Sequence, residues 1–195
     1  MITDLKINAE RKQFYYEKGY WTEKTLGDVW ADRVASHPER TYVSDDQGSS
    51  YTYGEIDDKA ARLAAWLVEQ GVAPGDVVTF QMPTWAEFCI VYVAALKAGA
   101  VMHPLPRNFN DADLVYGMNL VGSRAFICPT KVAKVDFESQ ILSIVDQIPT
   151  LGPVALVDKA APKHSELPTV AEICARYEPI EYPPPSRPVS YTHLR

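Results

Sequence analysis

The chain has 195 residues, of which 47% are hydrophobic, so it can bury one substantial core and is predicted to form one domain or a large subdomain. Its formal net charge is −6 and its lysines and arginines are dispersed, which argues against nucleic acid or an anionic membrane as a partner. The three cysteines lie far apart without Cys-x-x-Cys spacing, which indicates reduced thiols rather than a disulfide framework or a zinc site. The polar N-terminus and the shortness of the longest apolar run, residues 88–96, lead us to expect no signal peptide and no transmembrane segment. We therefore expect a cytoplasmic protein.

The first predicted elements are helices and a hairpin. Residues 8–18 are polar and aromatic and predict a short helix on the domain surface. Thr25 is expected to cap a second helix that ends before Pro38. The apolar face of this helix is formed by Leu26, Val29, Trp30 and Val34. Residues 41–44 and 50–53 predict two strands around an Asp-Asp-Gln-Gly turn, and hence a hairpin.

The next helix begins with capping-box spacing. Thr52 and Glu55 can each satisfy an unpaired backbone donor of the first turn. The residues of this helix that we expect to be buried are Ile56, Ala60, Leu63, Ala64 and Leu67. Residues 77–80 are rich in β-branched side chains and predict a buried strand. Thr84 is expected to begin a further helix, which is apolar nearly all round over residues 88–96 and is therefore expected to pack on both sides.

The rest of the chain continues to alternate strands and helices. The expected strands are 101–103, 125–128 and 153–157, and the expected helices are 110–122, 135–148 and 169–177. Strands that recur about every 25–30 residues with helices between them predict βαβ units. The fold class is therefore expected to be α/β, with a doubly wound, mostly parallel sheet covered on both faces.

The composition changes near the end of the chain. Five prolines follow Glu178, which predicts an extended linker over residues 179–195. Residues 188–195, PVSYTHLR, look like translated sequencing-adaptor sequence, so we expect a non-native tail; the alternative is a natural end. The expected division is a lead-in over 1–24, an α/β subdomain over 25–178, and the linker.

Motifs that would carry chemistry by themselves are missing from the sequence. It contains no Gly-x-Gly-x-x-Gly, no Gly-Lys-Ser/Thr phosphate loop and no Gly-x-Ser-x-Gly elbow. Lys97 could bind a phosphate or could be a cation that complements the dipole of the last helical turn. We prefer the second interpretation, because nothing in the flanking strand forms a phosphate nest. Gly99 is interpreted as a left-handed cap that ends the helix.

Five further side chains are considered as candidate site residues. His103 and Arg107 follow the end of a predicted strand, where open α/β sheets place their ligands. We interpret His103 as a half-buried histidine bonded to backbone, and Arg107 as a solvated loop cation. Three aromatic residues at helical positions are interpreted as core rather than as an acyl pocket, namely Trp66, Trp85 and Phe88.

Two segments together resemble a known family. Residues 51–56, YTYGEI, and 96–105, LKAGAVMHPL, are similar to the opening motifs of the adenylate-forming superfamily. That superfamily contains acyl- and aryl-CoA ligases, the adenylation domains of peptide synthetases, and luciferases. The resemblance covers residues 25–182. Within it, residues 11–30 and 81–88 are similar to short- and medium-chain or alicyclic acyl-CoA ligases, such as cyclohexanecarboxylate–CoA ligases.

The resemblance implies an activity for a longer parent protein. Such enzymes activate a small carboxylic acid with ATP and Mg²⁺ to an acyl-adenylate, and then transfer the acyl group to CoA. Their phosphate loop, acidic ATP ligand, hinge and catalytic lysine would all follow Arg195, so no catalytic, cofactor-binding or metal-binding residue is assigned here. We expect an inactive fragment that holds neither ATP, Mg²⁺ nor CoA. The alternatives are a freestanding α/β binding module and another adenylating enzyme, of the peptide-synthetase or aryl-CoA ligase type.

Overall fold

A four-stranded parallel sheet forms the centre of the fold. The computed structural model describes residues 8–158 and 166–181. The strands lie in the order β4-β3-β5-β8 and every neighbouring pair is parallel. Their bounds are Val77–Gln81 for β3, Val101–Leu105 for β4, Ser123–Pro129 for β5 and Val154–Val157 for β8. The expected α/β class with a parallel sheet is confirmed.

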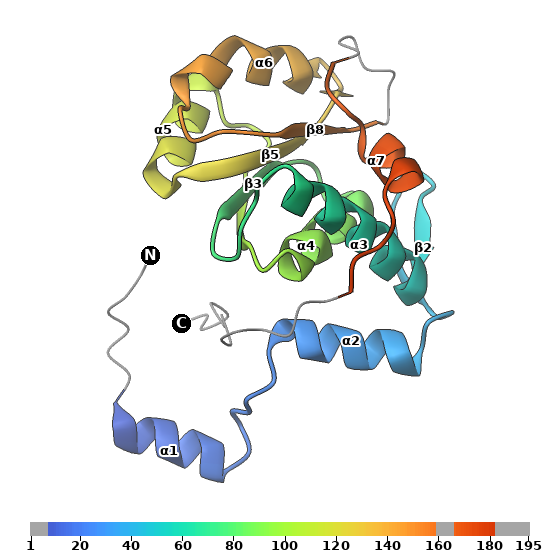
Figure 1. Ribbon diagram of the computed structural model, residues 1–195, viewed down its shortest axis with the longest axis vertical. Coiled ribbons are helices and arrows are strands. Elements are labelled where there is room, and N and C mark those ends of the chain that lie inside the picture. The colour runs from blue at the N-terminus through green and yellow to red at the C-terminus, as the bar shows by residue number, and fades with distance from the viewer. Residues whose placement is uncertain (1–7, 159–165, 182–195) are drawn as a thin grey trace.

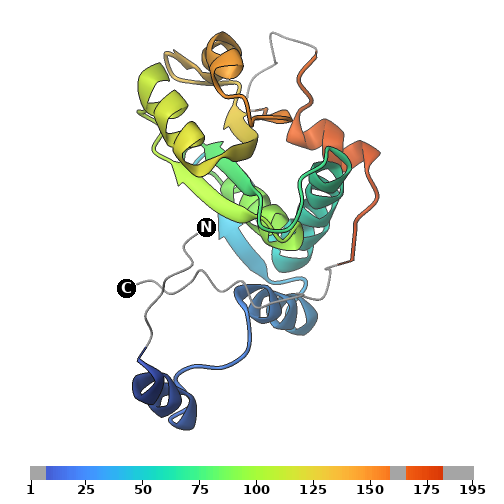
Figure 2. The ribbon, with the colours of Figure 1, turned by 60° about the vertical axis from the view of Figure 1, so that its left-hand side comes forward.

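Helices cover both faces of this sheet (Figures 1 and 2). The long helix α3 (Tyr53–Glu69) and α4 (Glu87–Lys97) lie on one face. On the other face lie α5 (Asp111–Val121) and α6 (Phe137–Ile144), the latter followed by a 3-10 turn, η1 (Val145–Gln147). This arrangement satisfies the requirement that a parallel sheet be shielded from water on both sides.

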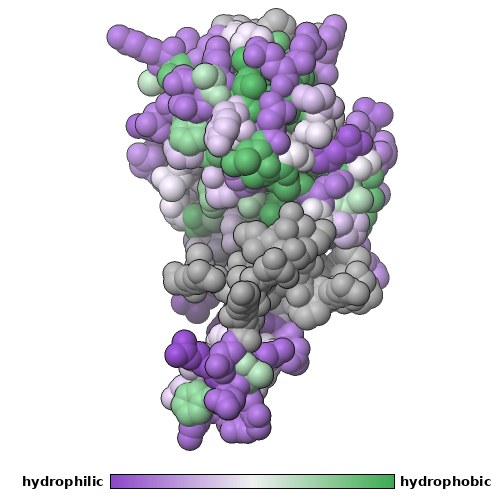
Figure 3. Space-filling model, turned by 90° about the vertical axis from the view of Figure 1, so that its left-hand side faces the viewer, coloured by the Kyte–Doolittle hydropathy of each residue, from purple (hydrophilic) through white to green (hydrophobic). Residues whose placement is uncertain are grey.

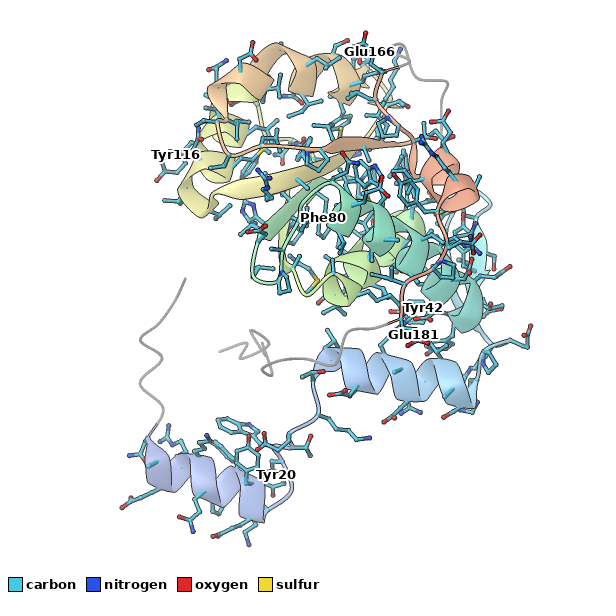
Figure 4. The ribbon with its side chains drawn as sticks, in the orientation of Figure 1. Tyr20, Tyr42, Phe80, Tyr116, Glu166 and Glu181 are labelled. Atoms are coloured by element: carbon cyan, nitrogen blue, oxygen red, sulfur yellow. The ribbon has the colours of Figure 1, made fainter. Side chains whose placement is uncertain are left out.

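The alternation of side chains along the strands divides the core into two parts. In β5, Ala125 and Ile127 belong to the cluster beneath α3 and α4, whereas Phe126 and Cys128 belong to the cluster beneath α5 and α6. Successive side chains of a strand point to opposite faces, so one short apolar run supplies both clusters. Figure 4 shows Phe80 of β3 in the interior, where its ring lies 5.2 Å from that of Phe88.

Capping boxes define the beginnings of several helices. In α3, the Thr52 hydroxyl accepts from the Glu55 backbone N–H at 3.2 Å, and the Glu55 carboxylate accepts from the Thr52 N–H at 2.8 Å. The expected cap at Thr25 is also confirmed, as is the cap at Asn110, which begins α5. These reciprocal bonds satisfy backbone donors that a helix cannot pair internally.

Most of the remaining elements are attached to the α3–α4 side or to the edges. They are the hairpin of β1 (Thr41–Ser44) and β2 (Ser50–Thr52), helix α2 (Leu26–Ser36) and helix α7 (Val170–Arg176). Helix α1 (Ala9–Glu17) lies apart from them. The residue after α7, Tyr177, accepts a bond from Arg62 of α3 at 2.7 Å through its carbonyl oxygen. Its hydroxyl donates to Glu69, also of α3, at 2.8 Å. No helix in the described part of the chain is long and apolar enough to cross a membrane.

Two predicted helices have different boundaries. The helix expected from Thr84 begins at Glu87, because the backbone N–H of Ala86 donates to Asp45 of the hairpin turn and residues 82–86 are held outside the helix. The helix expected over residues 135–148 is shorter. It is preceded by a small hairpin of β6 (Lys131–Val132) and β7 (Val135–Asp136), and Asp136 caps α6.

The surface placement of the first two helices also differs from expectation. Helix α1 has no buried residue and stands clear of the sheet domain in Figures 1 and 2, rather than lying on its surface. Its aromatic side chains pack instead on Trp21, whose ring is 4.9 Å from that of Tyr15. In α2, Val29 is exposed, whereas Leu26, Trp30 and Val34 are partly buried as expected. The predicted tail, residues 188–195, lies outside the described residues, as does most of the predicted linker.

Gly99 has the left-handed conformation that its position between α4 and β4 requires. Its φ is +68°, and a Cβ atom added there would lie 3.3 Å from Cβ of Pro74. The carbonyl oxygen of Gly99 accepts from the N–H of Gly75 at 2.9 Å, so the turn before β3 and the turn before β4 are tied together. The cap assignment is confirmed.

We predict that Gly99→Val destabilises the chain while Arg107→Ala does not. A β-branched residue at this φ costs at least about 1 kcal/mol, and the contact with Pro74 adds to that cost. Arg107 is exposed in a loop, and its truncation is expected to change stability by less than about 0.5 kcal/mol. Thermal unfolding of both variants measures this difference, and equal melting temperatures would contradict it.

Candidate functional site

A ligand of an open α/β sheet with this topology is expected to bind at the carboxyl ends of β3 and β5. The chain leaves β3 toward β4 and later leaves β5 toward β8, so the connections diverge between β3 and β5. Gln81 ends β3 there and is fully buried. Its amide nitrogen donates to the carbonyl oxygen of Pro106 at 2.9 Å, whereas its amide oxygen has no hydrogen-bond partner. Sequence analysis missed this group.

A row of polar side chains crosses the sheet nearer the start of the strands. Thr79 is completely buried, and its hydroxyl lies 3.0 Å from Nδ1 of His103 and within a hydrogen bond of the buried Ser123 hydroxyl. The three residues come from β3, β4 and β5. Burial lowers the pKa of His103 below its ordinary value, which favours the neutral ring. The expectation of a half-buried histidine is confirmed, but its partner is a hydroxyl rather than backbone.

Lys97 is a structural residue. It is 7% exposed, and its ammonium group lies 2.8 Å from Oδ1 of Asp57 on α3. The same carboxylate oxygen accepts a bond from the Trp30 indole nitrogen at 2.7 Å. One carboxylate therefore joins α2, α3 and α4, and the ammonium group of Lys97, at the carboxyl end of α4, is engaged in this ion pair. No spacing in the sequence identifies Asp57 as the partner of Lys97, or Trp30 as a second donor to Asp57.

The other residues considered as site candidates are also part of the core or lie on the surface. Arg107 is exposed and forms no ion pair with any described residue. Trp66 is 5% exposed in the core beneath α3 and α4, and Trp85 and Phe88 pack against that core. The interpretations of these residues as a loop cation and as core are confirmed.

A second polar cluster, which the sequence did not indicate, ties the hairpin to the start of α4. The Glu87 carboxylate accepts from the hydroxyl groups of Ser49 at 3.0 Å and Tyr51 at 3.2 Å. Burial, followed by the neighbouring Glu87 carboxylate, raises the pKa of Tyr51 to about 12. These bonds orient the hairpin; they offer no reactive group, because the tyrosine stays protonated at neutral pH.

The described residues contain no preformed cluster of metal ligands. Over residues 8–158 and 166–181 no three acidic, histidine or cysteine side chains come together in a way that could hold a metal ion. The lysine best placed in sequence to meet a phosphate is paired with Asp57. The described region therefore supplies a sheet and its supports, and we derive no chemical step from it.

Comparison with known proteins identifies the fold's family. The model of the family described as "AMP-binding enzyme" matches residues 30–191. The chain belongs to the AMP-binding enzyme family. The resemblance to adenylate-forming enzymes, drawn from two short motifs, is thereby confirmed.

Individual relatives of this AMP-binding chain are much longer than it is. It is 36% identical over 167 residues to the medium-chain fatty-acid–CoA ligase of Escherichia coli, a match that covers 86% of this chain and 30% of that protein. It is 28% identical over 186 residues to the salicyl-AMP ligase / salicyl-S-ArCP synthetase of Mycobacterium tuberculosis, covering 93% of this chain and 32% of that one. The apo structure of Mycobacterium smegmatis MbtA superposes with a TM-score of 0.75 at 28% identity, covering 92% of this chain and 32% of MbtA. The chain thus spans about a third of the length of these relatives.

We predict that Lys97→Met destabilises this AMP-binding chain substantially. Removing the ammonium group leaves the Asp57 carboxylate partly buried without its cation, which costs on the order of 2 kcal/mol. Lys24→Met is the matched control, because Lys24 forms an exposed ion pair with Asp32 and its loss is expected to leave stability unchanged. Urea unfolding of both variants provides the measurement. A Lys97→Met midpoint equal to that of Lys24→Met would show that the buried pair contributes nothing.

His103 is expected to make folding stability depend on pH. Its pKa is lower in the folded chain than in the unfolded chain, so the unfolded chain binds a proton first as the pH falls. The contribution to stability is complete above the unfolded value of about 6.5, and it declines as the pH falls from there toward the folded value. The difference in unfolding free energy between about pH 7.5 and about pH 5.5 should shrink in His103→Gln. The variant His37→Gln, at an exposed position, is the control and should retain the full difference.

Proposed function

We propose that this chain is the amino-terminal part of an ATP-dependent acid–thiol ligase. The parent enzyme activates a small, medium-chain or alicyclic carboxylate with ATP and Mg²⁺ to an acyl-adenylate, releases pyrophosphate, and transfers the acyl group to CoA. The observation that carries the proposal is the 36% identity to a medium-chain fatty-acid–CoA ligase over 86% of the chain. We place the enzyme in the cytoplasm, where ATP and CoA are available and the three thiols remain reduced.

The proposed role of this portion is to build a framework for chemistry that other segments perform. Adenylation needs cations and backbone donors around the phosphoryl group as charge redistributes in the transition state. The sequence contains no glycine-rich phosphate loop, and the described residues form no cluster of three or more acidic, histidine or cysteine side chains that could hold a metal ion. In this proposal residues 1–24 form a lead-in, residues 25–178 form the α/β subdomain, and residues 179–195 form a linker with a non-native tail.

A second candidate is an aryl-acid adenylating enzyme. It is favoured by the salicyl-AMP ligase, which matches 93% of this chain, although at 28% identity. Both candidates form an acyl-adenylate, and they differ in the acid and in the acceptor.

The two candidate functions can be distinguished by the acids that the complete enzyme activates. The source gene would be resequenced beyond the codon for residue 195, and the complete enzyme would be assayed for acid-dependent exchange of pyrophosphate into ATP. Hexanoate, octanoate and cyclohexanecarboxylate support the first candidate, and salicylate supports the second. Activation of amino acids alone would contradict both.

The isolated chain is predicted to catalyse no carboxylate-dependent exchange of pyrophosphate into ATP. Loss of one preorganised donor from such a site already costs about 100- to 1,000-fold in rate, and this sequence contains neither a Gly-x-Gly-x-x-Gly nor a Gly-Lys-Ser/Thr phosphate loop. The assay uses the purified chain with each acid named above. Exchange clearly above a blank without enzyme would contradict the prediction.

A further inference from the structure

Helix α7 and the residues that follow it run along the outer side of α3 (Figures 1 and 2). We call residues 170–181 the strap. Helix α7 has 7 residues, and a helix this short is marginal by itself in water. Its buried side chains, Val170 and Ile173, join the core cluster beneath α3 and α4. The conformation of the strap therefore depends on the rest of the domain, whereas the four parallel strands pair without it.

The polar contacts of the strap converge on α3. The Arg62 guanidinium donates to the Tyr177 carbonyl oxygen at 2.7 Å, and the Tyr177 hydroxyl donates to Glu69 at 2.8 Å. The backbone bond from the Ile180 N–H to the Ala61 carbonyl oxygen is long, at 3.4 Å. A hydrogen bond with a charged donor is stronger than one between neutral groups. The bond from Arg62 is therefore the main polar attachment of the strap to α3.

The end of the strap spans a groove instead of packing closely on the helices. The groove has a volume of about 400 Å³ and lies between residues 179–181 of the strap, the first half of α3 and the end of α4. Asp57 and Lys97 both line it, so their ion pair forms the wall that the strap faces. Atoms that border an open space lack contacts on one side, so this part of the strap gains little from packing.

We propose that the strap opens as a unit away from α3 while the parallel sheet stays folded, and that Arg62 is the residue that holds it closed. Segments that open independently of their domain have few buried apolar contacts and hydrogen bonds close to solvent. The strap meets this description, because most of its side chains are exposed. Opening widens the groove and admits water to the Asp57–Lys97 pair. The strap is thus a latch on the junction of α2, α3 and α4, and the inference does not depend on the proposed function.

Two of the chain's own cysteines distinguish opening of the strap from unfolding of the whole domain. Cys174 lies half-buried on α7, and its thiol donates to the Lys59 carbonyl oxygen of α3 at 3.5 Å. Cys128 of β5 is fully buried on the other face of the sheet, beneath α5 and α6. Figure 3 looks at the side of the molecule on which α5 lies, away from the strap. A thiol reagent therefore reaches Cys174 when the strap opens and Cys128 only when the domain unfolds.

The test follows maleimide labelling of both thiols, resolved by mass spectrometry, in the unsubstituted chain and in variants. Arg62→Gln removes the bond to Tyr177 and should accelerate labelling of Cys174 about tenfold. Labelling of Cys128 should accelerate by a similar factor, because unfolding of the whole domain also breaks that bond. Asp58→Asn is the matched control. It removes the ion pair with Arg62, keeps the bond to Tyr177, and should change either rate by no more than about twofold.

Ile141→Val in α6 separates the two kinds of opening. It weakens the buried cluster that contains Cys128 and should accelerate labelling of that thiol about 2- to 12-fold, while Cys174 keeps its rate. Equal acceleration of both thiols by Ile141→Val would overturn the proposal, because the strap would then open only when the whole domain unfolds. An unchanged Cys174 rate in Arg62→Gln would also overturn it, because the reagent would then reach this thiol with the strap in place.

A milder variant and a second readout cover the case in which Arg62→Gln does not fold. Tyr177→Phe removes only the bond from the hydroxyl to Glu69 and should accelerate labelling of Cys174 about two- to fivefold. In the unsubstituted chain, labelling of Cys174 should rise less steeply with urea than labelling of Cys128, because opening of the strap exposes less surface than unfolding of the domain. Identical urea dependences of the two thiols would refute an independent opening.

Discussion

The need to bury both faces of a parallel sheet governs the rest of this structure. Each strand must present apolar side chains on both sides, because parallel strands are connected by crossovers whose helices lie on the faces. The alternation along β5, with Ala125 and Ile127 toward α3 and α4 and Phe126 and Cys128 toward α5 and α6, meets this requirement within a few residues. The helices are positioned in turn by their caps. Thr52 and Glu55 fix the start of α3, and Asn110 fixes the start of α5, so that each helix begins where its apolar side can reach the sheet.

Polar residues inside the sheet are the exception to this pattern, because each buried polar group requires a hydrogen-bond partner. Thr79 lies in a strand that must bury both faces, and its hydroxyl is therefore paired with His103 and Ser123 from the two flanking strands. Gln81 is only half satisfied, because its amide oxygen remains without a partner at the carboxyl end of β3. An unsatisfied buried acceptor costs about 1–3 kcal/mol, so this end of the sheet has the less favourable hydrogen bonding of the two. It is also the end at which open α/β sheets place their ligands.

Local signals in the sequence were sufficient for most elements and insufficient for the contacts between them. Capping boxes, glycine positions and runs of β-branched residues act within a few residues, which is why α3, β3, α5 and the cap at Gly99 could be predicted. The start of α4 could not, because it depends on Asp45, 41 residues earlier, which accepts from the Ala86 N–H. The pairing of Asp57 with both Lys97 and Trp30 could not be predicted for the same reason, since three helices must pack before these groups meet. The later start of the helix predicted over residues 135–148 reflects the β6–β7 hairpin, which turns at Ala133 with a positive φ of 52° that its residue type does not signal.

The scaffold and the chemistry of this family are therefore carried by different kinds of feature. The two motifs that identify the chain, residues 51–56 and 96–105, contain a capping box, a buried lysine that forms an ion pair, and a left-handed glycine. Each of these features positions backbone, and none of them is free to contact a substrate. Features that build this sheet are needed whichever acid is activated, so they can identify the family from few residues and leave the choice of acid to side chains elsewhere.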